Sequence, residues 1–435
     1  MSGQTAADRQ SEHAALEGLL EVARRLGESS DLSLVLQTVI DALRDLLHAE
    51  RATVWVYDRP VDELFTHVAH GMAAQVVRIP AQRGIVGAAA HSRQVMLVPD
   101  AYADERFDRS VDARTGFLTR DILAIPLLDD EGALVGVAQV LNRVGGAFGE
   151  SDIRIGRALA AQAAVAVRRA RLLEDHEARL RLEEELEVAR TIQQGSFPTA
   201  LPMVARYSIF AQSTPADVCG GDAFDVIGIG AGGILAEGQP AERVIFLCAD
   251  ATGHGVGPAL SSMQARGMVR MGAQFNQPLS VVAPAVNRQF CADLPAGRFI
   301  TAWIALLDTT RNEIECFSAG QGPVYVFRSG TGQFEVVDSD ALPFGITADA
   351  MPFDQTQRLS LGVGDMVVVL TDGYSEAPSP AGEQFGEERL QQLIREGASG
   401  PLVNLMTRID TQVVAFAAAQ TTPDDRTAIF IRRDA

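Results

Sequence analysis

The first fifty residues carry apolar side chains at helical spacing. From about Ala14 to Leu47, leucine, valine and isoleucine recur every three or four residues, and the pattern is interrupted once, near Gly27–Ser30. A repeat of 3.6 residues indicates a helix that buries one face. The spacing therefore predicts two amphipathic helices separated by a short break.

Apolar runs of strand length follow these two helices. They cover Ala52–Tyr57, Leu64–Ala69, Ile122–Leu128 and Leu134–Leu141. The last two runs are separated by Asp129-Asp130-Glu131-Gly132, which predicts a hairpin turn. A helix is expected directly after this hairpin.

That helix is predicted to be long. It begins near Ser151, a suitable N-cap residue, and no proline occurs before Pro198. The only glycines between them are Gly156, near the start, and Gly195, at the end. Leucines stand among alternating arginines and glutamates in an imperfect heptad pattern. Two interpretations stay open: a solvated connector helix, or a parallel coiled coil that joins two copies of the chain.

From Tyr207 onward, short strands alternate with glycine-rich turns. The strand candidates are Val244–Ala249, Ala302–Leu307, Ile314–Ser318, Val324–Phe327, Met366–Leu370 and Thr427–Ile431. The helix candidates are Pro258–Met271, Leu279–Phe290 and Leu402–Ala419. Because short turns rather than regular helical crossovers join the strands, the pattern favours antiparallel sheets with helices packed outside, an α+β domain.

The composition is that of a globular protein with two or three domains. The chain has 435 residues, of which 47% are hydrophobic. Its longest apolar runs are far shorter than the roughly 18 residues that span a bilayer, and its N-terminus lacks a signal-peptide pattern. We therefore expect a cytoplasmic protein. A net charge of −19 opposes binding to nucleic acid or to an anionic membrane, because both carry the same sign.

Lysine is absent from the chain, so all 37 basic residues are arginine. P-loop nucleotide-binding proteins, protein kinases and pyridoxal-phosphate enzymes each depend on a lysine. The composition therefore excludes these three classes. The four cysteines show no paired spacing, and we interpret them as buried thiols in a reducing compartment.

Four short aspartate motifs lie in the second half of the chain. They contain Asp222, Asp250, Asp372 and Asp424, each in a turn or at the end of a strand. Asp250 and Asp372 directly follow apolar runs, and a carboxylate at the exposed end of a buried strand is held rigidly. One such motif alone predicts only a turn. Four in one region indicate a functional site.

Clustered carboxylates repel one another and favour a bound cation. Oxygen ligands select hard ions such as Mg²⁺ or Mn²⁺. No histidine follows His254, so a histidine-rich zinc site is not available in the last part of the chain. No cysteine is followed by arginine at the spacing of a thiolate phosphatase. The residues therefore point to a pair of metal ions that activate water and clamp a phosphoryl group.

Several motifs together carry a resemblance to a known family. In chain order they are Ile192-Gln193-Gln194, Phe197-Pro198, Leu201-Pro202, Val218–Asp222, Asp250, Gly253-His254-Gly255, Pro258-Ala259-Leu260, Phe299-Ile300-Thr301, Ser318-Ala319-Gly320, Gly364-Asp365, Leu370–Glu376 and Asp424–Thr427. From about Glu187 to Arg432 the chain resembles the PPM family of metal-dependent serine/threonine phosphatases, in its bacterial sporulation and stress-response branch. The family fold, an αββα sandwich of two stacked antiparallel sheets, agrees with the α+β pattern.

The resemblance implies a set of site residues. Asp250 would bridge two Mn²⁺ or Mg²⁺ ions, with the Ala251 carbonyl, Asp372 and Asp424 completing the first ion's shell. Asp222 would bind metal or metal-bound water. A metal-bridged hydroxide would then attack phosphoserine or phosphothreonine in line.

Further roles within this site stay open. The resemblance makes Asp225 and Asp425 weaker candidates for metal ligands. His254 would either protonate the leaving alkoxide or make a structural hydrogen bond within its turn.

The family pattern is not complete. Gln321 stands where the family usually has histidine, Cys219 replaces a common valine, and Ala223-Phe224 replaces a common aromatic pair. These departures bear on substrate positioning, and none removes a proposed metal ligand. The alternative to an active enzyme is a catalytically inactive phosphatase fold that serves as a binding scaffold and depends on the N-terminal domain.

The N-terminal region resembles a GAF sensor domain. The matching segments are Ile125-Pro126-Leu127, Gly132, Val135–Val137 and Val140–Arg143, with Phe148 and Asp152. The last part is close to the signature of cyclic-nucleotide-binding GAF domains, but Arg143 replaces its lysine and Ile153 its glutamate. No cysteine lies in residues 1–218, so a thiol-linked bilin is excluded there. A cyclic nucleotide, another small ligand, or dimerisation alone stays open.

The expected organisation has four parts. Residues 1–13 form a tail, 14–172 a GAF domain with an antiparallel sheet and helices, 173–196 a connector helix or coiled coil, and 197–435 the phosphatase domain. We expect a homodimer through the GAF domain and the connector, in which the GAF domain controls the metal site. By resemblance, the substrate would be a phosphorylated regulatory protein such as an anti-sigma-factor antagonist.

Overall fold

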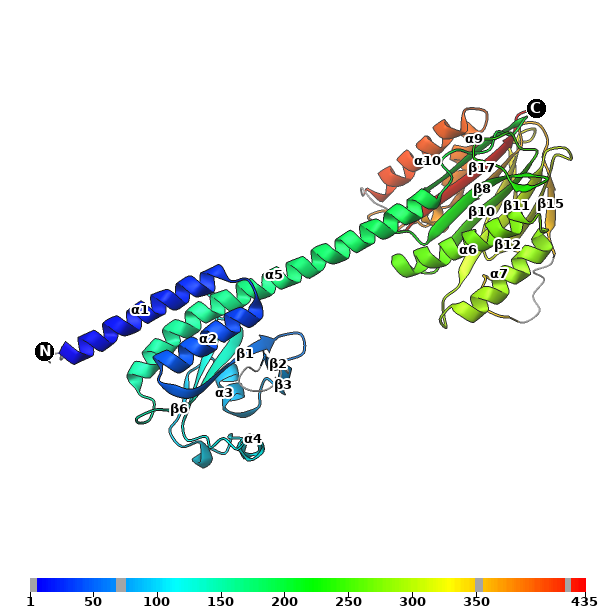
Figure 1. Cartoon of the computed structure of the whole chain (residues 1–435). Coiled ribbons are helices and arrows are strands. Elements are labelled where there is room, and N and C mark those ends of the chain that lie inside the picture. Colours follow the sequence, from blue (N-terminus) through cyan, green and yellow to red (C-terminus); the bar gives the residue numbers. More distant parts are fainter. Residues whose placement is uncertain (1–5, 68–75, 349–354, 419–423) are drawn as a thin grey trace. The chain divides into compact units, whose positions relative to one another are not determined.

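The computed structural model describes residues 6–67, 76–348, 355–418 and 424–435. The chain forms two compact units, Met1–Arg181 and Leu182–Ala435 (Figure 1). Each unit has its own sheets and its own buried core, so each is described by itself. In the described part of the chain, no helix is long and apolar enough to cross a membrane.

The first unit contains a six-stranded antiparallel sheet in the order β3-β2-β1-β6-β5-β4. The strands are β1 Ala49–Asp58, β2 Glu63–His67, β3 Val76–Pro80, β4 Met96–Val98, β5 Ile122–Leu128 and β6 Leu134–Arg143. The helices are α1 Ala6–Glu28, α2 Leu32–Leu46, α3 Gly84–Ser92, α4 Arg109–Thr115 and the start of α5 Glu150–Ser196, with one 3₁₀ turn at Ala101–Ala103. The two predicted helices, the four predicted strands and the hairpin are confirmed, although Val68 and Ala69 lie outside the described residues.

The sheet of the first unit is covered on both faces. Leu123 and Ile125 of β5 pack with α2 and α5 on one face, whereas Ile122 and Ala124 pack with α3 on the other. When both faces of a strand are buried, nearly all of its residues are apolar. This continuous apolar run is why β5 could be predicted from the sequence. Helix α2 begins at Asp31, whose side chain accepts the N–H of Leu34.

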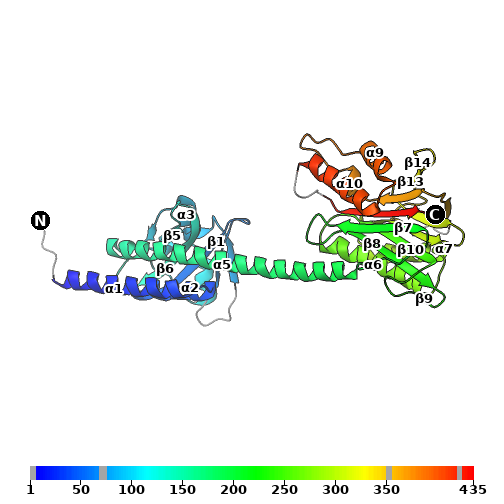
Figure 2. The ribbon, with the colours of Figure 1, turned by 90° about the horizontal axis from the view of Figure 1, so that it is seen from above.

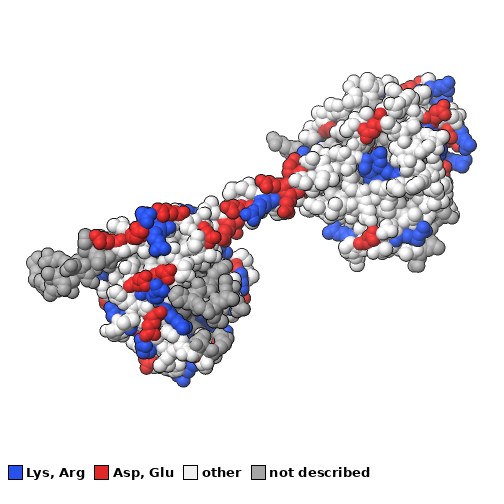
Figure 3. All heavy atoms as spheres, viewed as in Figure 1, with Lys and Arg blue, Asp and Glu red and all other residues white. Residues whose placement is uncertain are grey.

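Helix α5 is continuous over 47 residues, as its sequence predicted. Leu159 and Val167 lie in the core of the first unit, and Gln193 is buried in the second. Most side chains between Arg171 and Glu185 are exposed. Figure 3 shows acidic and arginine side chains following one another along this stretch. The pairing of two such helices in a coiled coil stays a prediction.

The second unit is built on two antiparallel sheets. The first has the order β15-β12-β11-β10-β8-β9, and the second β14-β13-β16-β17-β7. The strands are β7 Tyr207–Thr214, β8 Asp222–Gly230, β9 Gly233–Ile234, β10 Arg243–Ala251, β11 Ile300–Asp308, β12 Glu313–Ala319, β13 Val324–Arg328, β14 Gln333–Val337, β15 Gln357–Ser360, β16 Met366–Leu370 and β17 Arg426–Arg433. The helices are α6 Val256–Gln274, α7 Leu279–Asp293, α8 Asp372–Ser375, α9 Glu387–Gly397 and α10 Leu402–Ala417.

The two sheets are stacked, and helices cover the outer face of each (Figures 1 and 2). The core between the sheets includes Phe246 and Trp303 from the first sheet and Val367 and Ile429 from the second. Helices α6 and α7 pack on the outer face of the first sheet, and α9 and α10 on that of the second. The expected αββα sandwich is confirmed.

Candidate functional site

Asp222 and Asp250 lie opposite each other on neighbouring strands. Asp222 is the first residue of β8, and it pairs in register with Asp250 on β10. Side chains alternate between the two faces of a strand. Phe224 lies two residues from Asp222, and Cys248 lies two residues from Asp250, so each shares a strand face with its aspartate. Both pack in the core between the sheets. Both carboxylates therefore belong to the face that meets the second sheet, at the end of the sandwich.

Asp372 and Asp424 come from the second sheet. Asp372 follows Thr371 at the end of β16 and begins the short helix α8, and Asp424 precedes β17. Strands β16 and β17 are neighbours in this sheet. Both side chains are exposed, whereas Asp222 is only 2% exposed. The four predicted aspartates thus come from two pairs of adjacent strands, one pair in each sheet.

A direct hydrogen bond links the two sheets at this end. The Thr371 hydroxyl donates to Oδ2 of Asp222 at 2.9 Å, and it accepts the N–H of Thr427 at 2.8 Å. The sequence motif contained Thr371, but nothing in the sequence identified it as the partner of Asp222.

The electrostatics agree with a shared site. Burial, together with the charges of Asp372, Asp424 and Asp425, raises the pKa of Asp250 to about 7. Burial also raises the pKa of Asp222 well above its usual range, with a contribution from Asp250. Carboxylates that raise one another's pKa values in this way are stabilised by a cation.

The donor set fits a hard divalent ion. It consists of carboxylate oxygens and main-chain carbonyls such as that of Ala251, which are the ligands that Mg²⁺ and Mn²⁺ prefer. Within the ranges that the structure describes, no three acidic, histidine or cysteine side chains converge closely enough to hold an ion as they lie. The chemistry of the residues fits the metal, but their side chains are not arranged as a finished coordination shell.

Asp425 organises the main chain of the site. Its carboxylate accepts the N–H groups of Ala216, Gly221 and Asp222. These hydrogen bonds hold the segment before β8 against the start of β17. Its side chain thus has a structural task next to the candidate ligand Asp424.

Asp225 lies on the opposite face of β8 from Asp222. Its carboxylate is fully buried and forms ion pairs with Arg266 at 2.9 Å and Arg270 at 2.8 Å, both from α6. Burial raises the pKa of Asp225, whereas the two guanidinium groups lower it. The geometry therefore gives Asp225 a structural ion pair and separates it from the other carboxylates.

His254 is exposed in the turn between β10 and α6. Its Nδ1 lies 3.9 Å from a carboxylate oxygen of Asp217. Burial raises the pKa of the nearby Asp424, and His254 opposes part of this rise. Among the described residues, the ring makes no hydrogen bond within the turn. The turn is held instead by Arg298, which donates to the Thr252 carbonyl at 2.7 Å.

Gln321 connects strands from the two sheets just behind the carboxylates. Its Oε1 accepts from the Thr301 hydroxyl at 2.9 Å, and its Nε2 donates to the Leu370 carbonyl at 3.3 Å. Thr301 pairs with Asp250 on β11 and β10, and Leu370 precedes Thr371. The side chain is 4% exposed, so it supports the site from the inside.

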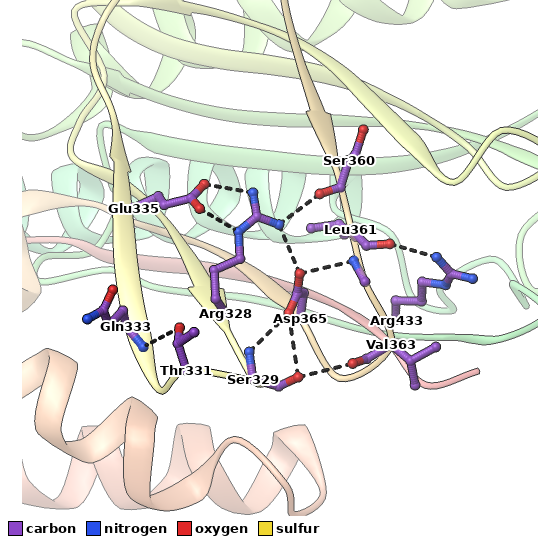
Figure 4. Close-up of polar contacts among 11 residues, drawn as sticks. Arg328, Ser329, Thr331, Gln333, Glu335, Ser360, Leu361, Val363, Asp365 and Arg433 are labelled. Carbon is purple, nitrogen blue, oxygen red and sulfur yellow. Dashed lines mark hydrogen bonds and ion pairs between the residues drawn. The ribbon is translucent and has the colours of Figure 1, made fainter.

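The Gly364-Asp365 motif lies at the end of β16 remote from Asp372. Figure 4 shows Asp365 bound to Arg328, which also forms a bidentate contact with Glu335. Asp365 accepts the N–H groups of Ser329 and Gly362 as well. This motif therefore fixes the turn before β16 and takes no part in the carboxylate site.

In the GAF-like unit, the signature residues have structural partners. Arg143 forms an ion pair with Asp152 at 2.9 Å, and Asn142 binds the main chain at Leu118 and Arg120. A cleft of ≈ 590 Å³ lies elsewhere, between α3, β5 and α5, and its lining includes Arg93 and Arg157 but none of the signature residues. The signature therefore stabilises the corner where β5, β6 and α5 meet.

Two family sequence models match the chain. Residues 31–167 match the GAF domain, and residues 240–434 match the family described as Stage II sporulation protein E (SpoIIE). The segment that matches SpoIIE holds strands β10 to β17 of the sandwich and contains Asp250, Asp372 and Asp424. The chain thus carries a GAF domain followed by a phosphatase domain of the SpoIIE family.

Individual proteins resemble the chain only at low sequence identity. The cGMP-specific 3′,5′-cyclic phosphodiesterase of Drosophila melanogaster is 26% identical over 174 residues, which are 36% of this chain and 16% of that protein. The corresponding protein of Drosophila sechellia is 28% identical over 175 residues, 36% of this chain and 14% of that protein. The chain therefore spans less than a fifth of the length of these relatives.

Two solved structures are similar to the chain at low sequence identity. The SiaA-PP2C domain of Pseudomonas aeruginosa has a TM-score of 0.48 and 20% identity, covering 59% of this chain and 98% of that one. The PP2C phosphatase domain of Bacillus subtilis SpoIIE with a fragment of its regulatory domain has a TM-score of 0.43 and 11% identity, covering 99% and 100%. The family assignment rests on the two sequence models and on the sandwich itself.

Proposed function

We propose that this protein is a signal-regulated, metal-dependent protein serine/threonine phosphatase. The observation that carries the proposal is the position of Asp222, Asp250, Asp372 and Asp424 at the ends of adjacent strands in two stacked sheets. Their raised pKa values favour a bound cation, and the match to the SpoIIE family supports hydrolysis of a phosphate ester.

The residues of the site have distinct tasks in this proposal. Asp250, the Ala251 carbonyl, Asp372 and Asp424 would hold Mn²⁺ or Mg²⁺ ions, two by the family resemblance, and Asp222 would bind an ion directly or through water. Ions bound there would supply an activated water and neutralise charge on the phosphoryl oxygens.

His254 is proposed to protonate the leaving alkoxide of the substrate. Its imidazole is exposed beside Asp217 and close enough to Asp424 to affect the pKa of that carboxyl. An imidazole can donate a proton near neutral pH. His254→Gln should therefore slow hydrolysis of a phosphoserine peptide much more than hydrolysis of p-nitrophenyl phosphate, whose leaving group needs no proton.

The substrate is proposed to be a phosphorylated regulatory protein, such as an anti-sigma-factor antagonist. This part rests on the family match of residues 240–434. Phosphoserine and phosphothreonine peptides would establish the substrate class, and purified candidate regulators would identify the partner.

Control by the GAF domain is proposed to act through a dimer of α5. Val165 and Leu172 are exposed seven residues apart, as are Leu173 and Leu180, and this spacing is typical of the contact face of a coiled coil. A small molecule bound to the GAF domain would bias the pairing, and cGMP is the first compound to test. Analytical ultracentrifugation should find a dimer, and removal of residues 1–170 should change the rate or its control. Identical kinetics without these residues would contradict the coupling.

The direct test is Mn²⁺-dependent phosphate release from an aryl phosphate and a phosphoserine peptide. We expect activity in the wild type and a loss of at least a hundredfold in Asp250→Asn. The matched control is Asp338→Asn, because Asp338 is exposed in the same unit outside the site, and it should keep wild-type activity. Calorimetry separates the alternatives if no activity is found. Tight Mn²⁺ binding would indicate a resting enzyme, and absence of binding would favour the inactive scaffold.

A further inference from the structure

The main chain just before Asp222 is tightly enclosed. A Cβ atom on Gly220 would lie 2.8 Å from a carboxylate oxygen of Asp425, and one on Gly221 would lie 2.7 Å from the Ala251 carbonyl oxygen. Asp425 also accepts the N–H groups of Gly221 and Asp222. The position of the Asp222 carboxylate is therefore set by this short strip of main chain.

Gln193, in the last turn of α5, binds the same strip. Its Nε2 donates to the Gly220 carbonyl at 2.7 Å, and its Oε1 accepts the Gly220 N–H at 3.2 Å. The side chain is 6% exposed, so water does not replace these bonds easily. One amide thus satisfies both main-chain groups of Gly220.

Two more contacts fasten the same end of α5 to this region. The Cys219 thiol lies 3.9 Å from the Leu186 carbonyl, and the rings of Phe197 and Phe224 stack with centroids 4.9 Å apart. These contacts lie on either side of Gly220 in the sequence. The end of α5 therefore cannot shift or turn without moving the start of β8.

We propose that Gln193 is a positioning residue for the carboxylate site and the point at which α5 acts on Asp222. Without its amide, the N–H and carbonyl of Gly220 lose their partners, and the strip before Asp222 loses one of the side chains that support it. Asp425 is another such side chain. The consequence for hydrolysis rests on the function proposed above, but the contact itself is testable without hydrolysis.

The first test compares amide hydrogen exchange in the metal-free full-length chain. Gln193→Met keeps the length of the side chain and removes both hydrogen bonds, and Gln194→Met makes the same change at a neighbouring exposed position. We expect the amides of residues 220–222 to exchange at least tenfold faster in Gln193→Met and at the wild-type rate in Gln194→Met. Wild-type protection in Gln193→Met would overturn the inference.

The second test measures Mn²⁺ affinity by calorimetry. We expect Gln193→Met to weaken binding at least tenfold while circular dichroism and Tm show a folded protein, and Gln194→Met to bind as the wild type does. A merely structural role would lower Tm and leave the affinity of the folded protein unchanged, which would overturn the inference.

A milder variant covers the case in which Gln193→Met does not fold. Gln193→Asn keeps the amide on a side chain that is shorter by one methylene, so it should show a smaller loss of affinity in the same direction. Wild-type affinity in a folded Gln193→Asn that has lost protection at Gly220 would overturn the inference. Absence of phosphate release by the wild type counts against the proposed function alone, whereas unchanged amide exchange counts against this inference alone.

Discussion

Thr371 and Asp222 are hydrogen-bonded across the two sheets, with 2.9 Å between the hydroxyl and the carboxylate oxygen. Both residues are 2% exposed. The hydroxyl also accepts the N–H of Thr427, so one side chain serves a carboxylate of the first sheet and the main chain of the second. Farther from this end, the space between the sheets is filled by apolar side chains such as Phe246 and Val369.

Replacement of Thr371 by valine should therefore destabilise the phosphatase unit. Valine keeps the shape but leaves the Asp222 carboxylate and the Thr427 N–H without this partner, at a cost of about 1–3 kcal/mol for each unsatisfied group. We expect Tm to fall by several degrees and Mn²⁺ affinity to change because Asp222 is less well oriented. Thr371→Ser, which keeps the hydroxyl, should remain close to wild type. Wild-type stability and Mn²⁺ affinity in Thr371→Val would show that the hydrogen bond to Asp222 contributes little.

Asp250 should make the stability of the metal-free protein depend on pH. Its pKa is raised to about 7, against about 3.9 in an unfolded chain, so the folded state binds more protons between these values. This contribution to stability is present at low pH and is lost as pH rises through about 7. In EDTA, Asp250→Asn should therefore gain Tm relative to wild type between pH 5 and 8. Excess Mn²⁺ should reverse the order, because a ligand of the folded state stabilises only the protein that binds it. A constant difference across this pH range would contradict the raised pKa.

Asp225 should contribute to the stability of the phosphatase unit and not to its affinity for metal ions. Asp225→Asn leaves Arg266 and Arg270 without their buried partner, and breaking a buried ion pair costs about 3–5 kcal/mol. We expect a large fall in Tm, with Mn²⁺ affinity of the folded protein within about twofold of wild type. Arg270→Gln, at the more exposed of the two arginines, provides a milder variant. A loss of affinity as large as that of Asp222→Asn would return Asp225 to the metal site.

The hydrogen bonds to the Asp365 carboxylate should stabilise the protein at all but acidic pH. Burial raises the pKa of Asp365, but hydrogen bonds from Arg328, Ser329 and Gly362 outweigh it, so the pKa lies below its usual range. A lowered pKa gives stability that is present above about pH 4 and is lost as pH falls further. Asp365→Asn should cost about 2 kcal/mol near neutral pH. The difference in Tm from wild type should close below about pH 4. A difference that persists there would mean that shape, and not charge, holds the turn.

Much of the fold could be predicted from the pattern of apolar residues. Predicted Ile122–Leu128 and Met366–Leu370 coincide with β5 and β16, because strands buried on both faces carry unbroken apolar runs. The edge strands β3, β14 and β15 were not predicted. Their side chains are largely exposed, so hydrophobicity does not mark them, and only pairing with a neighbouring strand defines them.

The four aspartates of the candidate site were proposed from the sequence, whereas the contacts that support them were not. The four aspartates could be chosen because each follows or precedes a strand or turn. Neither the roles of Thr371 and Gln193 nor that of Asp425 could be read from the sequence, because each depends on a contact between segments far apart in the chain. The alternation of a strand does separate Asp222 from Asp225, since an odd spacing places them on opposite faces.

Because of this alternation, β8 should tolerate substitutions better than a change in its length. Asp222 meets the second sheet and Asp225 meets α6, and both are held there by the pairing of β8 with β10. A substitution in β8 changes one contact. Insertion or deletion of a single residue between the two aspartates would shift the register and exchange the faces of every residue beyond it. The chain can therefore vary in this strand by replacing residues, but not by gaining or losing one.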